Sequence, residues 1–405
     1  MMTKNRSLFA VIMIGLVSCV LYGVGAAIRT NIGILLNPLG TQTDLPYDQV
    51  SFCIAVMNLT FGASQPFFGT LASRTSNRFV LTAGSILLIL SIAGMMTARS
   101  FPMLLLSLGL LFGAGGGAIA FGMVLTSAIY FTGREHAMTL SGLLNAASGM
   151  ISFLLAPLMQ NMLSHFGLTL TLTFLAVLAA ALIPITFFIT SRDPQKGIRA
   201  KQDKPKAEEN DINGLALLKH AFRNRTFRLL VAGFSTCGFH MVIIESHLFS
   251  QYVHYGISET SASWAFYFYG VSTILGALLS GYLSTRVHKG HLLGFYYGFR
   301  AVWVISYLLL MPKNIITAFV FSVGLGLTGD ATVSPTSGLV NQNFRLSQVA
   351  TLIGFLFLCH QIGAFLSAWL GGVFFEMTGD YTIIWTADIL LCSFASIMSL
   401  RISEK

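Results

Sequence analysis

The segment Gly69-Thr-Leu-Ala-Ser-Arg74 follows the second long apolar stretch of this chain, and Gly281-Tyr-Leu-Ser-Thr-Arg286 follows the eighth. The two segments begin 212 residues apart. The same offset relates Thr139-Leu140-Ser-Gly142 to Thr351-Leu352-Ile-Gly354. Two matches at one offset predict a chain built from two similar halves.

The composition excludes a soluble protein. Apolar residues make up 54% of the 405 residues and charged residues only 10%, and the mean hydropathy is +0.73. Soluble domains carry about 25% charged residues. We therefore expect an integral membrane protein with the lipid bilayer as its main surroundings. The net charge of +9 is spread over loops, so we expect no nucleic-acid partner. The five cysteines are isolated in apolar stretches and are predicted to be small core residues.

Twelve apolar stretches are each long enough to cross a bilayer as a helix, which takes about 20 residues. They are expected at residues 8–38, 48–70, 79–98, 101–126, 137–161, 167–190, 226–253, 260–283, 291–311, 315–338, 349–373 and 381–400. The runs are continuous and do not alternate, so strands are not expected. The predicted fold class is an all-α membrane protein with 12 transmembrane helices in two pseudo-symmetric six-helix halves.

A polar stretch at 191–225 divides the chain into an N-terminal half, 1–190, and a C-terminal half, 226–405. We expect this stretch to be a solvated linker that ends in a short surface helix near 213–223. Of the 24 Lys and Arg residues, 20 would lie in loops on one side of the membrane. The positive-inside rule places the linker and both termini in the cytoplasm. The first apolar stretch is too long for a cleaved signal peptide, so we expect a retained helix.

Over nearly its whole length the chain resembles the major facilitator superfamily of transporters. The two Gly-x-Leu segments are similar to the short loop motif of that superfamily. Its acidic position holds Ser73 and Thr285 here, so a salt bridge attributed to that acid is not expected. The residues that correspond to the rest of the motif are Gly69, Arg74, Gly281 and Arg286.

The chain more specifically resembles the bacterial monocarboxylate-transporter-like branch, which includes relatives of oxalate/formate exchangers. Three stretches carry this likeness: Arg29-x-x-x-Gly33-x-x-x-x-Pro38, Ser334-Pro335-Thr336-Ser337-Gly338-Leu339-Val340, and the segment from Gly354 to Gly372. The resemblance implies a small organic anion as substrate, bound between the halves near the bilayer midplane. The fifth apolar stretch lacks the Gly-Pro-x-x-Gly-Gly signature of drug/proton antiporters.

Two arginines lie inside apolar stretches, where a charge costs roughly 2.5–3.5 kcal/mol on insertion scales. We expect Arg29 to bind a substrate carboxylate, because guanidinium presents a planar fork of donors. The alternative is that Arg29 reaches the outer headgroups or has a structural partner. Arg300 matches Asp330 in depth, so the two are predicted to pair. The pair is either structural or a switch in which protonation of Asp330 frees Arg300 for substrate.

The remaining candidates are polar groups at membrane depth. Glu245 and His240 are candidates for proton coupling, together with Asp330, although Glu245 could instead contact outer water. Asp388 has no obvious partner in the sequence and is expected near the outer interface or bonded to a neighbouring helix. Candidates for substrate contact, each with interhelical hydrogen bonding as the alternative, are Asn31, Asn145, His360 and Gln361.

These features predict a secondary active transporter of a small organic anion, a monocarboxylate, that works by alternating access. Transport would be coupled to protons or to anion exchange. No metal-ligand spacing, nucleotide-binding motif or catalytic set is present in the sequence, so we expect no enzyme activity, metal or cofactor. We expect a monomer in the bacterial inner membrane. Two alternatives stay open: an efflux antiporter for amphipathic or drug-like compounds, and a membrane sensor that transports nothing.

Overall fold

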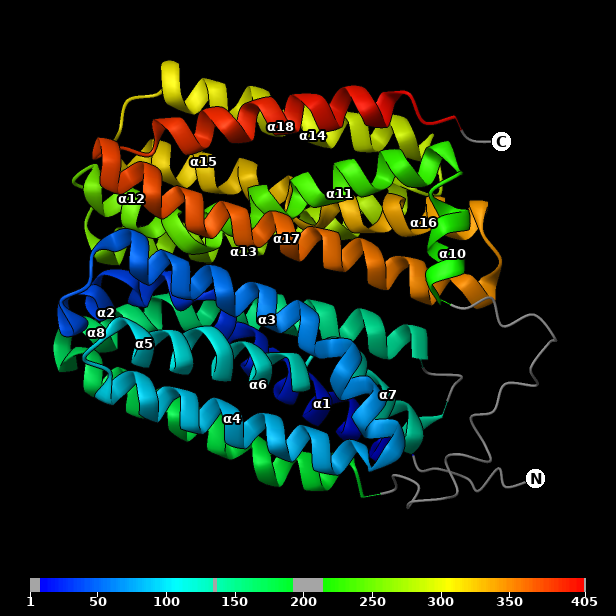
Figure 1. The fold of residues 1–405 in the computed structure, drawn as a ribbon, viewed down its shortest axis with the longest axis horizontal. Helices are drawn as coiled ribbons and strands as arrows, with labels where there is room; N and C mark the ends of the chain where they lie inside the picture. Colours follow the sequence, from blue (N-terminus) through cyan, green and yellow to red (C-terminus); the bar gives the residue numbers. More distant parts are fainter. Residues whose placement is uncertain (1–7, 134–136, 192–213, 404–405) are drawn as a thin grey trace. The chain divides into compact units, whose positions relative to one another are not determined.

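The computed structural model describes residues 8–133, 137–191 and 214–403, and every regular element in these ranges is a helix (Figure 1). Eleven helical segments in the described ranges are long and apolar enough to cross a membrane. The predicted fold class is thus confirmed. Arg134, which is one of the 20 cations expected in loops on one side of the membrane, and the cationic part of the linker lie outside the described residues.

The chain forms two compact units. Unit 1 comprises Met1–Asp44 and Val56–Glu208, and unit 2 comprises Leu45–Ala55 and Glu209–Lys405. The division after Glu208 falls inside the predicted linker. The surface helix predicted near 213–223 is observed as α10, Gly214–Ala221.

In unit 1, α1 packs against α8 and α7, and α4 packs against α8 and η2. The helices that contribute to this unit are α1 (Leu8–Thr30), η1 (Ile32–Leu35), α2 (Leu36–Thr43), α3 (Tyr47–Arg74), α4 (Asn77–Thr97), α5 (Phe101–Leu104), η2 (Leu105–Phe112), α6 (Gly113–Ala118), α7 (Phe121–Thr132) and α8 (Ala137–Ile189).

In unit 2, α11 packs against α17 and α18, α13 against α15, and α14 against α18. Besides α10, its helices are α11 (Arg225–Ile243), η4 (Ile244–Leu248), α12 (Phe249–His254), α13 (Glu259–Leu283), α14 (Lys289–Leu309), α15 (Ile315–Thr328), η5 (Asp330–Thr332), α16 (Val333–Asn343), α17 (Leu346–Thr378) and α18 (Thr382–Leu400).

The fifth and sixth predicted spans are joined in the 53-residue segment α8, which is why eleven segments stand for twelve predicted spans. At about 1.5 Å per residue, a straight helix of this length would be far longer than a bilayer is thick. Gly167 divides it with φ 75° and ψ 178°, and the chain turns back at this point (Figure 1). This backbone conformation is essentially restricted to glycine.

Several predicted spans are interrupted, where the sequence suggested continuous helices. The first span breaks after Thr30, at Asn31, and continues as η1 and α2. The tenth breaks at Gly329, where φ is −48° and ψ is −80°. The fourth breaks at Ala120, whose backbone is extended. Such breaks expose backbone groups that a membrane cannot solvate, so neighbouring side chains must satisfy them.

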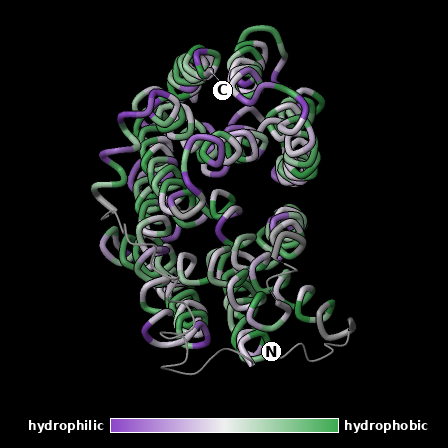
Figure 2. The backbone as a smooth tube through the Cα atoms, turned by 90° about the vertical axis from the view of Figure 1, so that its right-hand side faces the viewer, coloured by the Kyte–Doolittle hydropathy of each residue, from purple (hydrophilic) through white to green (hydrophobic). Residues whose placement is uncertain are grey.

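Large apolar side chains face outward from the helices of both units, as a lipid-facing surface requires. Leu278 is 67% exposed, Leu309 is 78% exposed, and Phe67 is 63% exposed. Figure 2 shows hydrophobic residues around the helices rather than only along their inner sides. The five cysteines are all free and buried, as predicted.

The turn in α8 yields a stability test. Replacing Gly167 by Ala should lower the free energy of unfolding by about 1–3 kcal/mol, because a Cβ is disfavoured at this φ and ψ. No heavy atom lies within 4 Å of the added Cβ, so the backbone alone would cause the loss. Thermal unfolding of the purified wild type and variant in detergent measures this loss of stability.

Gly142→Ala is the matched control, because Gly142 lies in the same segment, in helical conformation, and also has nothing within 4 Å of an added Cβ. This control should leave stability unchanged or raise it. Equal unfolding temperatures for the two variants would contradict the assigned turn.

Candidate functional site

Arg29 lies in the last turn of α1 and is half-buried. Its Nη1 donates to the amide oxygen of Asn58 on α3 at 3.2 Å, and its guanidinium carbon lies 4.7 Å from the centre of the Phe61 ring. These two contacts help to orient the guanidinium. The C-terminal end of a helix also favours a cation. The arrangement holds a charged fork in a fixed orientation within unit 1.

Two other predicted substrate contacts in unit 1 have different surroundings. Asn31 is buried, and its amide nitrogen donates to the carbonyls of Ala27 at 2.9 Å and Ser152 at 2.6 Å. Both amide hydrogens are therefore used to join the broken end of α1 to α8. Asn145 on α8 is exposed. Substrate contact by either residue stays a prediction.

Arg300 on α14 is fully buried and caps the break in the tenth span. Its Nη2 donates to the backbone carbonyls of Thr328 and, at 2.7 Å, Gly329. These carbonyls lie at the C-terminal end of α15, where the helix has no further N–H groups to donate to them. Its Nη1 contacts the Cys237 sulfur at 3.4 Å. The cation thus satisfies backbone acceptors and complements the dipole at the end of α15.

The two acidic residues predicted to take part in proton coupling lie in irregular parts of unit 2. Asp330 is exposed at the start of η5, next to the break that Arg300 caps. Glu245 is half-buried in the π-helical turn η4, an irregularity often found at functional sites. The specific Arg300–Asp330 pair stays a prediction.

His240 and Asp388 form a buried pair that sequence reasoning missed. His240 Nδ1 lies 2.8 Å from Asp388 Oδ2, and both side chains are fully buried between α11 and α18. This settles the expectation for Asp388 in favour of a bond to a neighbouring helix. No sequence signal links the two residues, because 148 positions separate them.

Cys392 completes this cluster, with its sulfur 3.6 Å from Asp388 Oδ1. The three side chains offer atoms of kinds that bind Zn²⁺, all within 4.8 Å of one another. The 2.8 Å separation of His240 and Asp388 is nevertheless that of a hydrogen bond. We therefore interpret the pair as a hydrogen bond between α11 and α18.

His360 and Gln361 lie on α17 against α11. A Cβ at Gly238 would collide with the His360 carbonyl, so the two helices are in close contact there. His360 Nδ1 and Gln361 Oε1 are buried and have no hydrogen-bond partner among the described residues. Buried polar atoms usually have a partner, so these two atoms remain candidates for binding substrate or water.

The loop-motif residues lie at exposed helix ends. Gly69 and Arg74 are exposed at the end of α3. In unit 2, Arg286 is exposed beyond α13, and its guanidinium carbon lies 5.4 Å from the centre of the Tyr282 ring. Gly281 lies one turn earlier, in the last turn of α13. The two copies thus occupy corresponding places in the two units.

The buried pair generates a test by double substitution. Asp388→Ala should lower the free energy of unfolding by about 3–5 kcal/mol, because it leaves His240 buried without its partner. Adding His240→Ala should cost less than the sum of the single losses. Thermal unfolding of the purified variants measures the coupling.

The control combines His240→Ala with Asp44→Asn. Asp44 is exposed and lies in unit 1, so the two effects should add. If the losses in unfolding free energy of His240→Ala and Asp388→Ala also added simply in the double variant, their contact would contribute nothing to stability.

Comparison with known families gives a match across nearly the whole chain. The sequence model of the Major Facilitator Superfamily matches residues 18–254 and 248–403. An uncharacterized MFS-type transporter of Bacillus subtilis, YcxA, is 24% identical over 92% of this chain and 90% of its own length. Mouse monocarboxylate transporter 11 is 23% identical over 92% of this chain and 81% of its own length.

Solved structures share the fold. A bacterial homologue of the human lysosomal transporter Spinster aligns with a TM-score of 0.75 at 16% identity, over 98% of this chain and 97% of that one. The nucleoside transporter NupG aligns with a TM-score of 0.76 at 14% identity, over 96% and 99%. The family match, the two helical units and these structures together show that the chain belongs to the Major Facilitator Superfamily of membrane transporters.

Proposed function

We propose that this transporter moves small organic anions, with monocarboxylates as the substrate class. The observation that carries the proposal is Arg29, a half-buried guanidinium that Asn58 and Phe61 hold in place. A dehydrated guanidinium keeps its charge and matches a carboxylate with two parallel hydrogen bonds. The likeness to a mouse protein named for monocarboxylate transport supports the same substrate class.

In this proposal the two cations have different roles. Arg300 donates to backbone carbonyls at the end of α15 and holds the break in the tenth span together. Arg29 binds the substrate carboxylate. The distinction follows from their partners, because the carbonyls at Thr328 and Gly329 would lose their donor if Arg300 turned toward a substrate.

The energy source proposed for transport follows from the negative charge of the substrate. An anion entering a cell against an inside-negative potential costs about 2.3 kcal/mol per 100 mV. A proton carried with a monovalent anion cancels this cost, and so does exchange for another such anion. We favour proton coupling because unit 2 contains Glu245 in a π-helical turn and the buried, hydrogen-bonded pair His240–Asp388. The halves would alternate access to the substrate as in other transporters of this design.

Substitution of Arg29 tests the proposal. Purified protein in liposomes should take up labelled lactate faster when a proton gradient is directed inward. Arg29→Ala should reduce uptake by at least about 30-fold, since losing a charged partner costs about 2 kcal/mol or more. Arg29→Lys should retain part of the activity, because it keeps the charge without the planar fork.

The matched control is Arg99→Ala, which removes an exposed arginine between α4 and α5 whose guanidinium donates to the backbone carbonyl of Ala98. It should transport like the wild type. Full uptake by a folded Arg29→Ala protein would exclude the proposed role of Arg29. Transport of organic cations that depends on Glu245 or Asp330 instead would favour an efflux antiporter for amphipathic compounds.

A further inference from the structure

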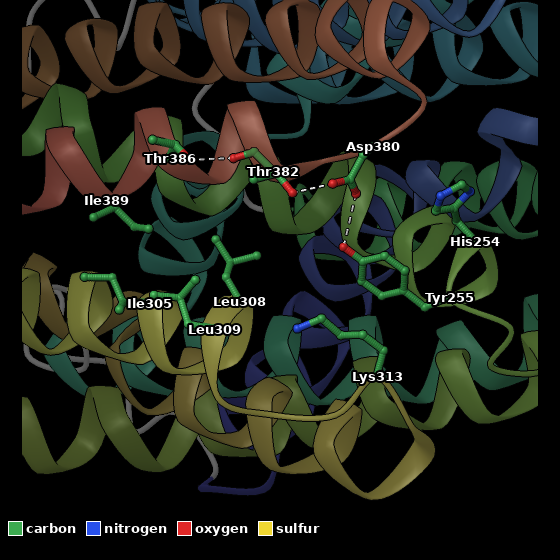
Figure 3. Close-up of a pocket in the computed structure, with 10 residues that line it drawn as sticks. All are labelled: His254, Tyr255, Ile305, Leu308, Leu309, Lys313, Asp380, Thr382, Thr386 and Ile389. Atoms are coloured by element: carbon green, nitrogen blue, oxygen red, sulfur yellow. Dashed lines mark hydrogen bonds between the residues drawn. The ribbon is translucent and has the colours of Figure 1, made fainter.

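Unit 2 has a cavity of about 600 Å³ at the helix ends, away from the candidate site. It lies where α14 ends and α18 begins, beside the end of α12 (Figure 3). One side of the lining is polar and includes Lys313, Asp380 and Tyr255. The other side is apolar and includes Ile305, Leu309 and Ile389. None of these residues was singled out from the sequence as a binding residue.

Lys313 supplies a cation at the polar side. Its ammonium group donates to the backbone carbonyls of Tyr307 and, at 3.4 Å, Met311. It also lies 3.9 Å from the centre of the Tyr307 ring. All of these partners are neutral. Partial burial lowers the pKa of Lys313, and the nearby carboxylate of Asp380 opposes this effect. A partly desolvated cation of this kind is stabilised by a bound anion.

Asp380 supplies an anion on the same side. Its Oδ1 accepts from the Tyr381 backbone N–H at 2.7 Å and from the Tyr255 hydroxyl at 3.3 Å, and its Oδ2 accepts from the Thr382 hydroxyl. Burial raises the pKa of Asp380, but these hydrogen bonds outweigh it and keep the pKa below its usual value. The group is therefore a carboxylate at neutral pH, and none of its donors is a cation.

The two charges are separated rather than paired. Figure 3 shows Lys313 and Asp380 on opposite sides of the Tyr255 ring, and no hydrogen bond or ion pair joins their side chains in the described structure. A ligand that carries both a negative and a positive group therefore matches the polar side better than a simple ion does.

The apolar side continues from the polar side along the helices. Leu309 is 78% exposed and Ile305 is 38% exposed in the last turns of α14. Ile389 lies two turns into α18, about 10 Å from the helix start at about 1.5 Å per residue. Polar groups at the helix ends and apolar groups deeper along the spans are the pattern that a lipid at the membrane interface presents.

We propose that this cavity binds a phospholipid with a phosphate and a primary ammonium group, as in phosphatidylethanolamine. The phosphate binds the Lys313 ammonium, and the lipid ammonium donates to the Asp380 carboxylate. An acyl chain covers Ile305, Leu309 and Ile389. Phosphatidylglycerol has no cation for Asp380, and phosphatidylcholine has no N–H to donate. A soluble zwitterion such as an amino acid would leave the apolar side uncovered.

Native mass spectrometry of the full chain tests this directly. The protein is incubated in detergent with equal amounts of phosphatidylethanolamine and phosphatidylcholine of identical acyl chains. The wild type should retain the ethanolamine lipid roughly tenfold more, the ratio expected for one charge-assisted hydrogen bond. The preference should fall stepwise as the ammonium group is methylated once, twice and three times. This series needs no variant, so it does not depend on how a variant folds.

Asp380→Asn should bring the ratio of the two lipids close to one, because it removes the acceptor for the lipid N–H. Lys313→Gln should lower the retention of both lipids and keep their ratio, because both carry the phosphate. Lys289→Gln, at the opposite end of α14, and Asp44→Asn, in unit 1, are the matched controls and should keep the wild-type retention and preference. Equal retention of both lipids by the wild type would overturn the proposal, and so would an unchanged preference in Asp380→Asn or unchanged retention in Lys313→Gln. The measurement involves no transported substrate, so it is independent of the proposed transport function.

Discussion

The fold depends on one constraint: inside a bilayer, every backbone N–H and carbonyl must find its partner within the protein. Continuous helices meet this constraint by themselves, but this chain interrupts them at Asn31, Ala120 and Gly329. Each break requires a side chain or a neighbouring helix to satisfy the freed groups. Arg300 does so at the end of α15, where a buried guanidinium donates to two carbonyls. Asn31 joins the broken end of α1 to α8 through its amide.

This constraint distinguishes the roles proposed for the two arginines. A buried arginine bound to backbone carbonyls cannot leave them without exposing unsatisfied acceptors, which favours a structural role for Arg300. Arg29 lies at the end of α1, where its contacts include the Asn58 amide and the Phe61 ring, and it is the arginine that we propose binds the substrate carboxylate. In unit 2, the hydrogen bond between His240 and Asp388 joins two different helices, α11 and α18.

The sequence was sufficient to predict the helices, the two similar halves and the family. The lengths of the apolar stretches and the repeated loop residues can be read locally along the chain. It placed Gly167 at the start of the sixth predicted span without showing the positive φ there. It could not show which polar residues meet. The pairing of His240 with Asp388 and the capping of α15 by Arg300 depend on helix packing between residues far apart in the chain. The separated charges of Lys313 and Asp380 were likewise invisible, because each appears as an ordinary loop residue.

The most direct test of anion transport coupled to a proton is the net charge moved in each cycle. Vesicles containing the protein are given a fixed pH gradient, and the membrane potential is set with potassium and valinomycin while labelled lactate accumulates. Electroneutral transport predicts the same accumulation at zero and at 100 mV, inside negative. An anion crossing alone would accumulate about 50-fold less at that potential, since about 2.3 kcal/mol opposes each charge. That result would contradict proton-coupled entry of the anion.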